Sequence, residues 1–229
     1  FPNNPKALFH LGKLYYHKEK LADAEKNLKL SIQADSQNAN THYYLAKILT
    51  FDEDPSLAKK HFYKALEINP DFAEAYYELA FHAENSGDLN EAKIHFQKAT
   101  DVEQNFAEAY FNLGSSFQQL GKLDDSIKFY EKAITVRPNY AAAYYKLSYL
   151  KKYTASDPEI AKMQSLLSSD NITQLSRINL CFALAKVNEN LDNQDELFKY
   201  LNEANRLHKQ EFEFSIDKQQ KFFEIIKSN

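Results

Sequence analysis

The sequence predicts an all-α fold, an α-solenoid of helical hairpins, and three observations support this. Residues 73–106 and 107–140 align without a gap over 34 positions, and both segments begin with Ala-Glu-Ala-Tyr; a fixed period of this length is typical of solenoids. Apolar or small residues recur at positions 4, 7, 8 and 11 and again at positions 20, 24 and 27, which is the spacing of one face on each of two helices. Between the two sets, position 15 holds Gly87 and Gly121, where the end of a helix favours a residue that tolerates positive φ.

Six such units and two terminal segments account for the chain. The ranges are residues 1–4 (the tail of a preceding repeat), 5–38, 39–72, 73–106 and 107–140 (four repeats), 141–177 and 178–211 (two degenerate units) and 212–229 (a C-terminal capping helix). Asp54-Pro55 and Asp157-Pro158 stand at the turns of the second and fifth units, because Asp is a favourable N-cap and Pro fits the first position of a helix. The chain starts within the pattern and without Met, so we expect a fragment of a longer protein.

The pattern weakens in the fifth unit. Lys151 and Gln164 occupy positions 11 and 24, which are apolar in the preceding units, and residues 168–173 add a few residues beyond the period. A second helix over about residues 158–168 is still expected. An amphipathic helix is expected over about residues 216–227, where its apolar side chains could cover the open end of the array or form a patch for self-association. These side chains are Phe222, Phe223, Ile225 and Ile226.

Composition and charge exclude several classes of protein. The chain has 229 residues, with 28 basic and 32 acidic side chains, so its net charge is 28 − 32 = −4. A nucleic-acid surface needs a clustered excess of Lys and Arg, so we expect no nucleic-acid partner. No apolar run approaches the ~20 residues of a membrane span, and no signal-peptide pattern opens the chain. A single cysteine excludes an internal disulfide and fits a reducing compartment, which predicts a cytoplasmic location.

No pattern in the chain predicts catalysis, a cofactor or a metal. The four glycines stand at positions 8 and 15 of the repeats, where helix packing and capping explain them, so none is left for a phosphate-binding loop. The histidines form no HExxH motif. His42 is expected to pack in the core, whereas His61 and His95, both at position 23, are expected to be exposed. Cys181 is expected to be a buried, inert thiol. No Ser–His–acid set or pair of carboxylates stands out, and we predict no enzyme activity for this chain.

The repeated residues resemble the tetratricopeptide repeat. The matching residues are Tyr76, Leu79, Ala80, Gly87, Ala92, Phe96 and Ala99 in one unit and Tyr110, Leu113, Gly114, Gly121, Tyr130, Ala133 and Pro138 in the next. The resemblance implies a right-handed superhelix in which positions 2, 5, 9, 12 and 13 of each first helix face a concave groove. It also implies a non-catalytic scaffold that binds a protein or peptide segment in that groove.

An aromatic residue stands at position 5 of the first five units. These residues are Phe9, Tyr43, Tyr77, Phe111 and Tyr145, and Phe81 and Tyr149 add rings at position 9. Packed helices lie ~8–10 Å apart and an extended peptide rises ~3.3 Å per residue, so this ladder of rings would meet roughly every third residue of a bound strand. Tyr and Phe offer a large contact area at low entropic cost. The alternative is that these rings only pack against the next helix.

The charge of the predicted groove changes along the chain. Lys6, Lys13 and Lys47 lie in the first two repeats, Glu74, Glu84 and Glu108 in the middle, and Lys152 at the far end. This order favours a ligand whose acidic end lies at the first two repeats. The alternative is a solvated charge pattern that has no partner.

The last third of the chain resembles the linker region of bacterial repeat-containing sulfotransferases. The resemblance covers about residues 157–229 and is carried by Asp157-Pro158, Met163, Leu166-Leu167, residues 182–186 and residues 200–207. It implies an alternative function, the N-terminal acceptor-recruiting region of a sulfotransferase whose catalytic domain lies beyond residue 229 and contacts this chain. The family's donor-binding loop has no counterpart here, so no catalytic residue is carried over.

Overall fold

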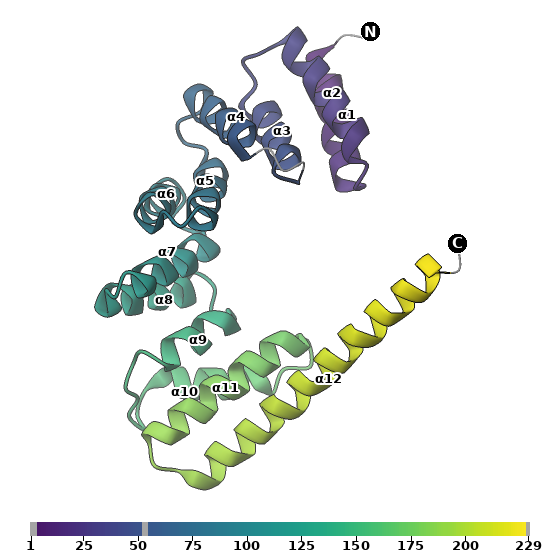
Figure 1. Cartoon of the computed structure of the whole chain (residues 1–229). Coiled ribbons are helices and arrows are strands. Elements are labelled where there is room, and N and C mark those ends of the chain that lie inside the picture. Colours follow the sequence, from purple (N-terminus) through teal and green to yellow (C-terminus); the bar gives the residue numbers. More distant parts are fainter. Residues whose placement is uncertain (1–3, 52–54, 228–229) are drawn as a thin grey trace. The chain divides into compact units, whose positions relative to one another are not determined.

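A computed structural model describes the backbone of residues 4–51 and 55–227 and the side chains of residues 4–50 and 55–210. Twelve helices lie in this described part, which contains no strand (Figure 1). They are α1 (Pro5–His17), α2 (Leu21–Ala34), α3 (Ala39–Phe51), α4 (Pro55–Ile68), α5 (Ala73–Asn85), α6 (Leu89–Val102), α7 (Ala107–Gln119), α8 (Leu123–Val136), α9 (Ala141–Ser148), α10 (Pro158–Leu167), α11 (Gln174–Asn190) and α12 (Gln194–Lys227). The chain divides into two compact units, Phe1–Lys122 (unit 1) and Leu123–Asn229 (unit 2), and each is described by itself.

Unit 1 consists of three helical hairpins followed by α7. In each hairpin the two helices pack against each other, α1 on α2, α3 on α4 and α5 on α6. Figure 1 shows α3 and α5 on one side of the unit and α4 and α6 on the other. The expected stripes form the core, because the side chains of Leu45, Leu79, Phe62 and Phe96 are fully buried. The all-α solenoid of helical hairpins predicted from the 34-residue period is confirmed.

The turn between the two helices of a hairpin uses left-handed backbone at position 15. Gly87 has φ +83° and Gly121 φ +73°, as the sequence predicts. Glu19 and Asp192 occupy the equivalent position of the first and sixth units with φ 58° and 55°. Four turns therefore share one backbone geometry, although only two of them use the residue that adopts it without cost.

The start of α6 links one hairpin to its neighbour. Asp88 caps the helix, since its carboxylate accepts a hydrogen bond from the Glu91 backbone N–H at 2.9 Å. A capping box would return the Glu91 side chain to the Asp88 N–H. Instead Glu91 forms a salt bridge with Lys59 of α4 at 3.0 Å. Of the two residues of the motif, Asp88 therefore caps the helix and Glu91 links it to the preceding repeat.

Unit 2 packs α9, α10 and α12 against α11. Its core contains Tyr144, Met163, Leu184 and Val187. The weak pattern of the fifth unit is reflected in two short helices, α9 of 8 residues and α10 of 10. Position 11, which is apolar in the preceding units, holds Lys151, and its ammonium group forms salt bridges with nearby carboxylates.

The C-terminal region differs from the expectation in two ways. Helix α11 begins at Gln174, before the expected boundary at residue 178. Second, α12 continues without a break from Gln194 to Lys227. The described part of the expected C-terminal helix over residues 212–229 therefore continues the helix of the sixth unit, and its capping role stays a prediction. Figure 1 shows the second half of α12 extending past the end of α11. The side chains of Phe222, Phe223, Ile225 and Ile226, expected to form a cap or patch, lie outside the described residues.

Candidate functional site

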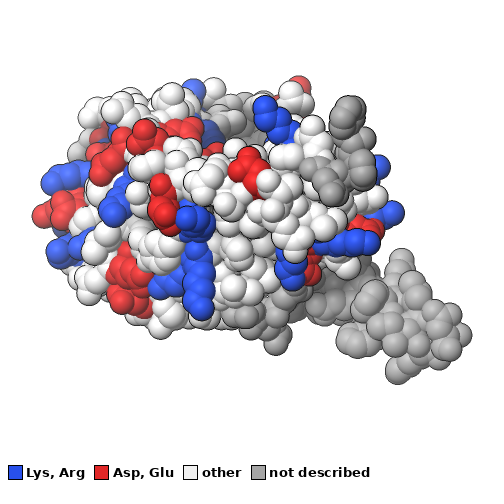
Figure 2. Space-filling view, turned by 90° about the horizontal axis from the view of Figure 1, so that it is seen from above, with Lys and Arg blue, Asp and Glu red and all other residues white. Residues whose placement is uncertain are grey.

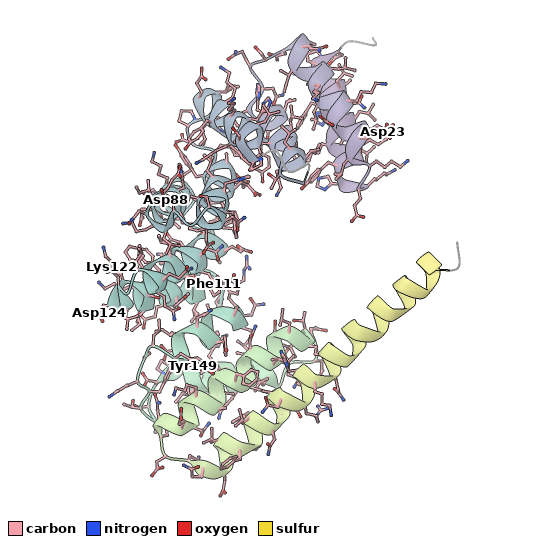
Figure 3. All side chains as sticks on the ribbon, viewed as in Figure 1. Asp23, Asp88, Phe111, Lys122, Asp124 and Tyr149 are labelled. Atoms are coloured by element: carbon pink, nitrogen blue, oxygen red, sulfur yellow. The ribbon has the colours of Figure 1, made fainter. Side chains whose placement is uncertain are left out.

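The candidate site in unit 1 is the face made by positions 5, 6, 9, 12 and 13 of α1, α3, α5 and α7, here called the first-helix face. Partly exposed aromatic rings line it. These are Phe9, Tyr16, Tyr43, Tyr44, Tyr77, Phe81 and Phe111. Figure 3 labels Phe111 on α7 and places Asp88 at the turn leading into α6. The predicted groove rings of the first four repeats are therefore half-buried, and their packing determines how much of each ring a ligand can reach.

The position-5 rings of the second and third repeats pack in the same way. The Tyr43 ring lies 5.9 Å from the Phe62 ring and 4.9 Å from the Phe72 ring. Tyr77 repeats this arrangement, with centroid distances of 5.6 Å to Phe96 and 4.8 Å to Phe106. One side of each ring therefore belongs to the core of its own hairpin, as the packing alternative requires, and the other side remains at the surface.

The hydroxyl groups of these two tyrosines reach the following repeat. The Tyr43 hydroxyl donates to Glu78 at 3.4 Å, and the Tyr77 hydroxyl accepts a hydrogen bond from the Asn112 side-chain amide at 2.9 Å. Glu78 and Asn112 both stand at position 6 of their repeats. Burial and the nearby Glu78 carboxylate raise the pKa of Tyr43, so its hydroxyl remains protonated. These bonds hold the rings in place without a ligand.

Two of the predicted groove lysines, Lys13 and Lys47, differ in their partners. Lys47 forms a salt bridge with Glu78 at 2.6 Å. Burial lowers the pKa of Lys47, but the hydrogen bond and the attraction of Glu78 outweigh it, so the pKa is raised overall. Lys13 lies 5.3 Å from the centroid of the Tyr44 ring and makes no salt bridge within the described part of the chain. Lys13 is thus a cation of the first-helix face that has no carboxylate partner among the described residues.

The acidic residues lie in the third and fourth repeats. Glu74 is exposed and Glu108 is half-buried. Glu84 accepts a hydrogen bond from the Gln119 side chain at 3.1 Å. Lys6 at the first repeat is exposed. Lys6, Glu74 and Glu108 stand at position 2, beside the first-helix face, and the change of charge along the groove stays a prediction.

The remaining predicted groove residues lie in unit 2. The Tyr145 and Tyr149 rings are 5.2 Å apart, and Tyr149 is 52% exposed. Phe182 at position 5 of the sixth unit extends the series, with its ring 6.1 Å from that of Tyr145. Lys152 is exposed. A continuous ladder from Phe9 to Tyr145 would involve both units and stays a prediction.

Three residues of the first-helix face were missed by the sequence analysis. Tyr16, His17 and Tyr44 form, with Phe9 and Lys13, a group here called the Tyr44 cluster. Tyr16 and His17 stand at positions 12 and 13, which were expected to face the groove, so the signal was present in the repeat register. Tyr44 stands at position 6, which contacts the preceding repeat.

The histidines correct one expectation. His95 is only 6% exposed and His61 is half-buried, so the expected exposure of position 23 is wrong. The His42 and His61 Nδ1 atoms are 2.9 Å apart, and His42 Nε2 lies 3.2 Å from the Ser36 carbonyl oxygen. Because His42 donates through Nε2 to Ser36, its Nδ1 accepts from the His61 Nδ1–H, so His42 is neutral. Burial lowers the pKa of both histidines.

Other chemistry is limited in the part of the chain that the structure describes. No group of three or more His, Cys, Asp or Glu side chains there is arranged to hold a metal ion. None of the helices searched is both long and apolar enough to span a membrane. Cys181 is buried, and burial raises the pKa of its thiol to about 11, so it is unreactive at neutral pH. On the face seen in Figure 2, acidic and basic side chains are interspersed.

Family models described as tetratricopeptide repeat match three segments of the chain. The matched residues are 5–38, 52–115 and 107–140. No curated protein sequence matches the chain. None of these matches bears on the resemblance of residues 157–229 to a sulfotransferase linker, which stays a prediction.

Solved structures of the same fold cover most of the chain. Pseudomonas aeruginosa pilF is 18% identical with a TM-score of 0.67, covering 92% of this chain and 97% of that one. A MamA protein is 20% identical with a TM-score of 0.58 and covers 93% and 97%. YrrB, described as a TPR protein with an unusual peptide-binding site, is 17% identical with a TM-score of 0.58 and covers 88% and 93%. At these identities the likeness shows the fold alone.

Proposed function

The chain belongs to the tetratricopeptide repeat family, and we propose that it is a non-catalytic scaffold that binds an extended segment of a partner protein on the first-helix face. The observation that carries this proposal is the row of half-exposed rings on that face. Two of them, Tyr43 and Tyr77, are held by ring contacts with the core and by hydroxyl hydrogen bonds to the next repeat. Rings fixed before binding lose little further entropy when a ligand covers them. The peptide-binding site that the YrrB description mentions supports the same use of the fold.

The packing also determines how the groove can be tested. Replacing Tyr77 and Phe111 by Ala together would remove core contacts of Tyr77, so a loss of binding would not report on the groove alone. Phe81 at position 9 is a better probe, because it is half-buried and lacks the hydroxyl hydrogen bond that Tyr77 makes to the next repeat. Its ring lies 4.9 Å from Tyr77 and 5.7 Å from the core ring of Phe96, so the melting temperature has to show that Phe81→Ala remains folded. Ile94 on α6 is 51% exposed and provides a matched apolar control on a second helix.

The experiment is a selection of random peptides on the full chain, followed by calorimetric titration of a selected peptide. Phe81→Ala is expected to weaken binding about tenfold, which is the loss of a moderate anchor residue, whereas Ile94→Ala leaves the affinity unchanged. Melting temperatures of both variants verify that they are folded. If peptides are selected but Ile94→Ala weakens them and Phe81→Ala does not, the site is elsewhere and the proposal is wrong.

A second candidate is the acceptor-recruiting region of a sulfotransferase. The short α10 and the long α12, which depart from the regular repeats, lie within the residues that resemble the linker of that family. The parent gene decides this candidate, because a strand, a Gly/Ser/Thr-rich loop and a helix should be encoded shortly after residue 229. A coding sequence without that segment contradicts it. The cytoplasmic location and the self-association through the C-terminal helix stay predictions of the sequence.

A further inference from the structure

The Tyr44 cluster differs from the rest of the first-helix face in its uncompensated charge. In the second repeat, Lys47 at position 9 meets Glu78 at position 6 of the third repeat, so the pair is neutral. In the first repeat, Lys13 at position 9 meets Tyr44 at position 6 of the second, so the same geometry places an ammonium group against a ring. A ring attracts a cation without neutralising it. The cluster therefore attracts an anion, whereas its neighbour does not.

Other aromatic rings adjoin the Tyr44 ring on which Lys13 lies. The Tyr44 ring lies 5.4 Å from the Tyr16 ring, 6.1 Å from the His17 ring and 6.0 Å from the Phe9 ring. The Tyr16 and His17 rings both meet it edge-on. None of these three rings is buried, so a ligand that lies along α1 contacts them directly.

A hollow adjoins the cluster at the turn between α1 and α2. Its volume is about 470 Å³, and Tyr16, His17, Glu19 and Leu21 line it. The hollow is large enough for an apolar side chain. Glu19 at its rim is flanked by the exposed Lys18 and Lys20, so the turn adds no net negative charge.

The spacing on α1 matches an extended peptide. Tyr16 and His17 follow Lys13 by three and four residues, which places these side chains on one face of the helix about 5–6 Å apart. In an extended strand, side chains two residues apart lie on the same face and are about 6.6 Å apart. A strand along α1 would thus place one side chain at Lys13 and the next one on that face at Tyr16 and His17.

We propose that the Tyr44 cluster is a subsite for an acidic segment of a partner protein, in which Asp or Glu stands two residues from an aromatic or large aliphatic residue. The carboxylate pairs with Lys13, and the apolar side chain covers Tyr16 and Tyr44 and enters the hollow. This inference rests on the proposed function, because it names the partner that the first-helix face takes at its N-terminal end. It also replaces the expectation that Lys47 attracts the ligand, since Glu78 already neutralises that residue.

The test uses two short peptides of Gly and Ser with both ends blocked, so that no terminal charge takes part. One contains Glu two residues before Phe, the other Lys two residues before Phe, and both carry the same uncharged dye. Fluorescence anisotropy measures their affinity for the full chain. We expect the acidic peptide to bind about fivefold more tightly at low salt, and the preference to shrink at high salt because exposed charges are screened.

Three variants assign the effect. Lys13→Gln removes the preference, whereas Lys60→Gln, which removes an exposed cation from α4, leaves it unchanged. Tyr16→Ala weakens both peptides, with the melting temperature as a control for folding. Equal affinities for the two peptides, or a preference that survives Lys13→Gln, would overturn the inference.

The library-selected peptide separates this inference from the proposed function. If that peptide depends on Phe81 while the acidic preference is absent, the scaffold function stands and the acidic subsite is wrong. If no library peptide binds the first-helix face, the proposed function fails as well.

Discussion

At the scale of single residues, position 15 shows how one backbone geometry is reached by different side chains. A side chain in the left-handed region costs roughly 1–2 kcal/mol, which glycine avoids. Glu19 and Asp192 adopt this region with φ 58° and 55°, whereas Gly87 and Gly121 adopt it freely. A substitution that removes this backbone cost in the first or sixth unit would therefore raise the free energy of unfolding without a new contact.

We expect Glu19→Gly to raise the free energy of unfolding by about 0.5–1 kcal/mol, because the relief of strain exceeds the added freedom of the unfolded chain. Gly87→Ala is expected to lower it by about 1 kcal/mol. No atom lies within 4 Å of a Cβ built on Gly87, so the loss would come from the backbone alone. Urea denaturation measures both changes, and the same sign for both would contradict this account.

Lys151 shows that a break in the pattern need not be a weak point. Its ammonium group lies 2.8 Å from Glu159 and 3.3 Å from Asp157, and the carboxylates outweigh the effect of burial and raise the Lys151 pKa. Lys151→Met restores an apolar residue at position 11 but leaves these carboxylates unpaired. We expect it to destabilise unit 2 by about 1–3 kcal/mol.

The double variant Lys151→Met with Glu159→Gln is the control for Lys151→Met. Because it removes one of the unpaired charges, it should regain part of the lost melting temperature. If Lys151→Met alone is as stable as the original chain, the charge cluster contributes nothing to the stability of unit 2.

At the scale of elements, the contact between α3 and α4 depends on the protonation of two histidines. His42 on α3 and His61 on α4 share one hydrogen bond, in which a neutral His42 accepts at Nδ1 from His61. Their pKa values are lowered below 6.5, chiefly by burial. Lys64, close to His42, and Lys29, close to His61, lower these values further, whereas Glu67 opposes the effect at His42.

Stability from this pair is fully present above pH 6.5 and is lost as the pH falls below it, because the unfolded chain then binds protons that the folded chain excludes. We therefore expect a lower melting temperature at pH about 5 than at pH about 8. His42→Tyr should reduce this dependence, since Tyr76 fills the same position in the next repeat. His82 and His95, whose pKa values are also lowered mainly by burial, account for the remainder.

His10 is exposed and serves as the control for the histidine pair. His10→Gln should leave the pH dependence unchanged. An unaltered pH profile in His42→Tyr would show that the pair does not control it.

At the scale of the whole molecule, each hairpin is covered mainly by its neighbours in the chain, so stability is close to a sum of local terms. Cys181, the single cysteine, lies in the core of unit 2, and its pKa is raised to about 11. Its reaction with a thiol reagent therefore measures the opening of unit 2 alone, whereas circular dichroism measures both units.

We expect slow labelling of Cys181 in the absence of urea and a labelling transition that does not coincide with the loss of helicity, because units stabilised by local contacts need not unfold together. Stopped labelling along a urea series provides the measurement. Coincident transitions would mean that the array unfolds as one cooperative body.

Much of the fold could be predicted because the period of the sequence specifies the direction of each side chain around its helix. Tyr77, Leu79 and Phe96 were placed by this reasoning. The period specifies less well how deeply a side chain is buried. His95 at position 23 is buried because Tyr76 stacks on it and Tyr63 of the neighbouring hairpin contacts it. The continuity of α12 could not be predicted either, since a change in apolar pattern need not interrupt backbone hydrogen bonds.

The candidate site was predicted only in part, for the same reason. Position 5 and the lysines were identified by register, but the pairing of Lys47 with Glu78 and the stacking of Lys13 on Tyr44 depend on distances between repeats. The sequence by itself determined the hairpins and their turns, because these follow from local periodicity, and the resemblance to the tetratricopeptide repeat indicated the face that carries the rings. Tertiary structure alone decided which charges remain uncompensated, because an ion pair forms between residues that are about 30 positions apart and meet only when one hairpin packs on the next.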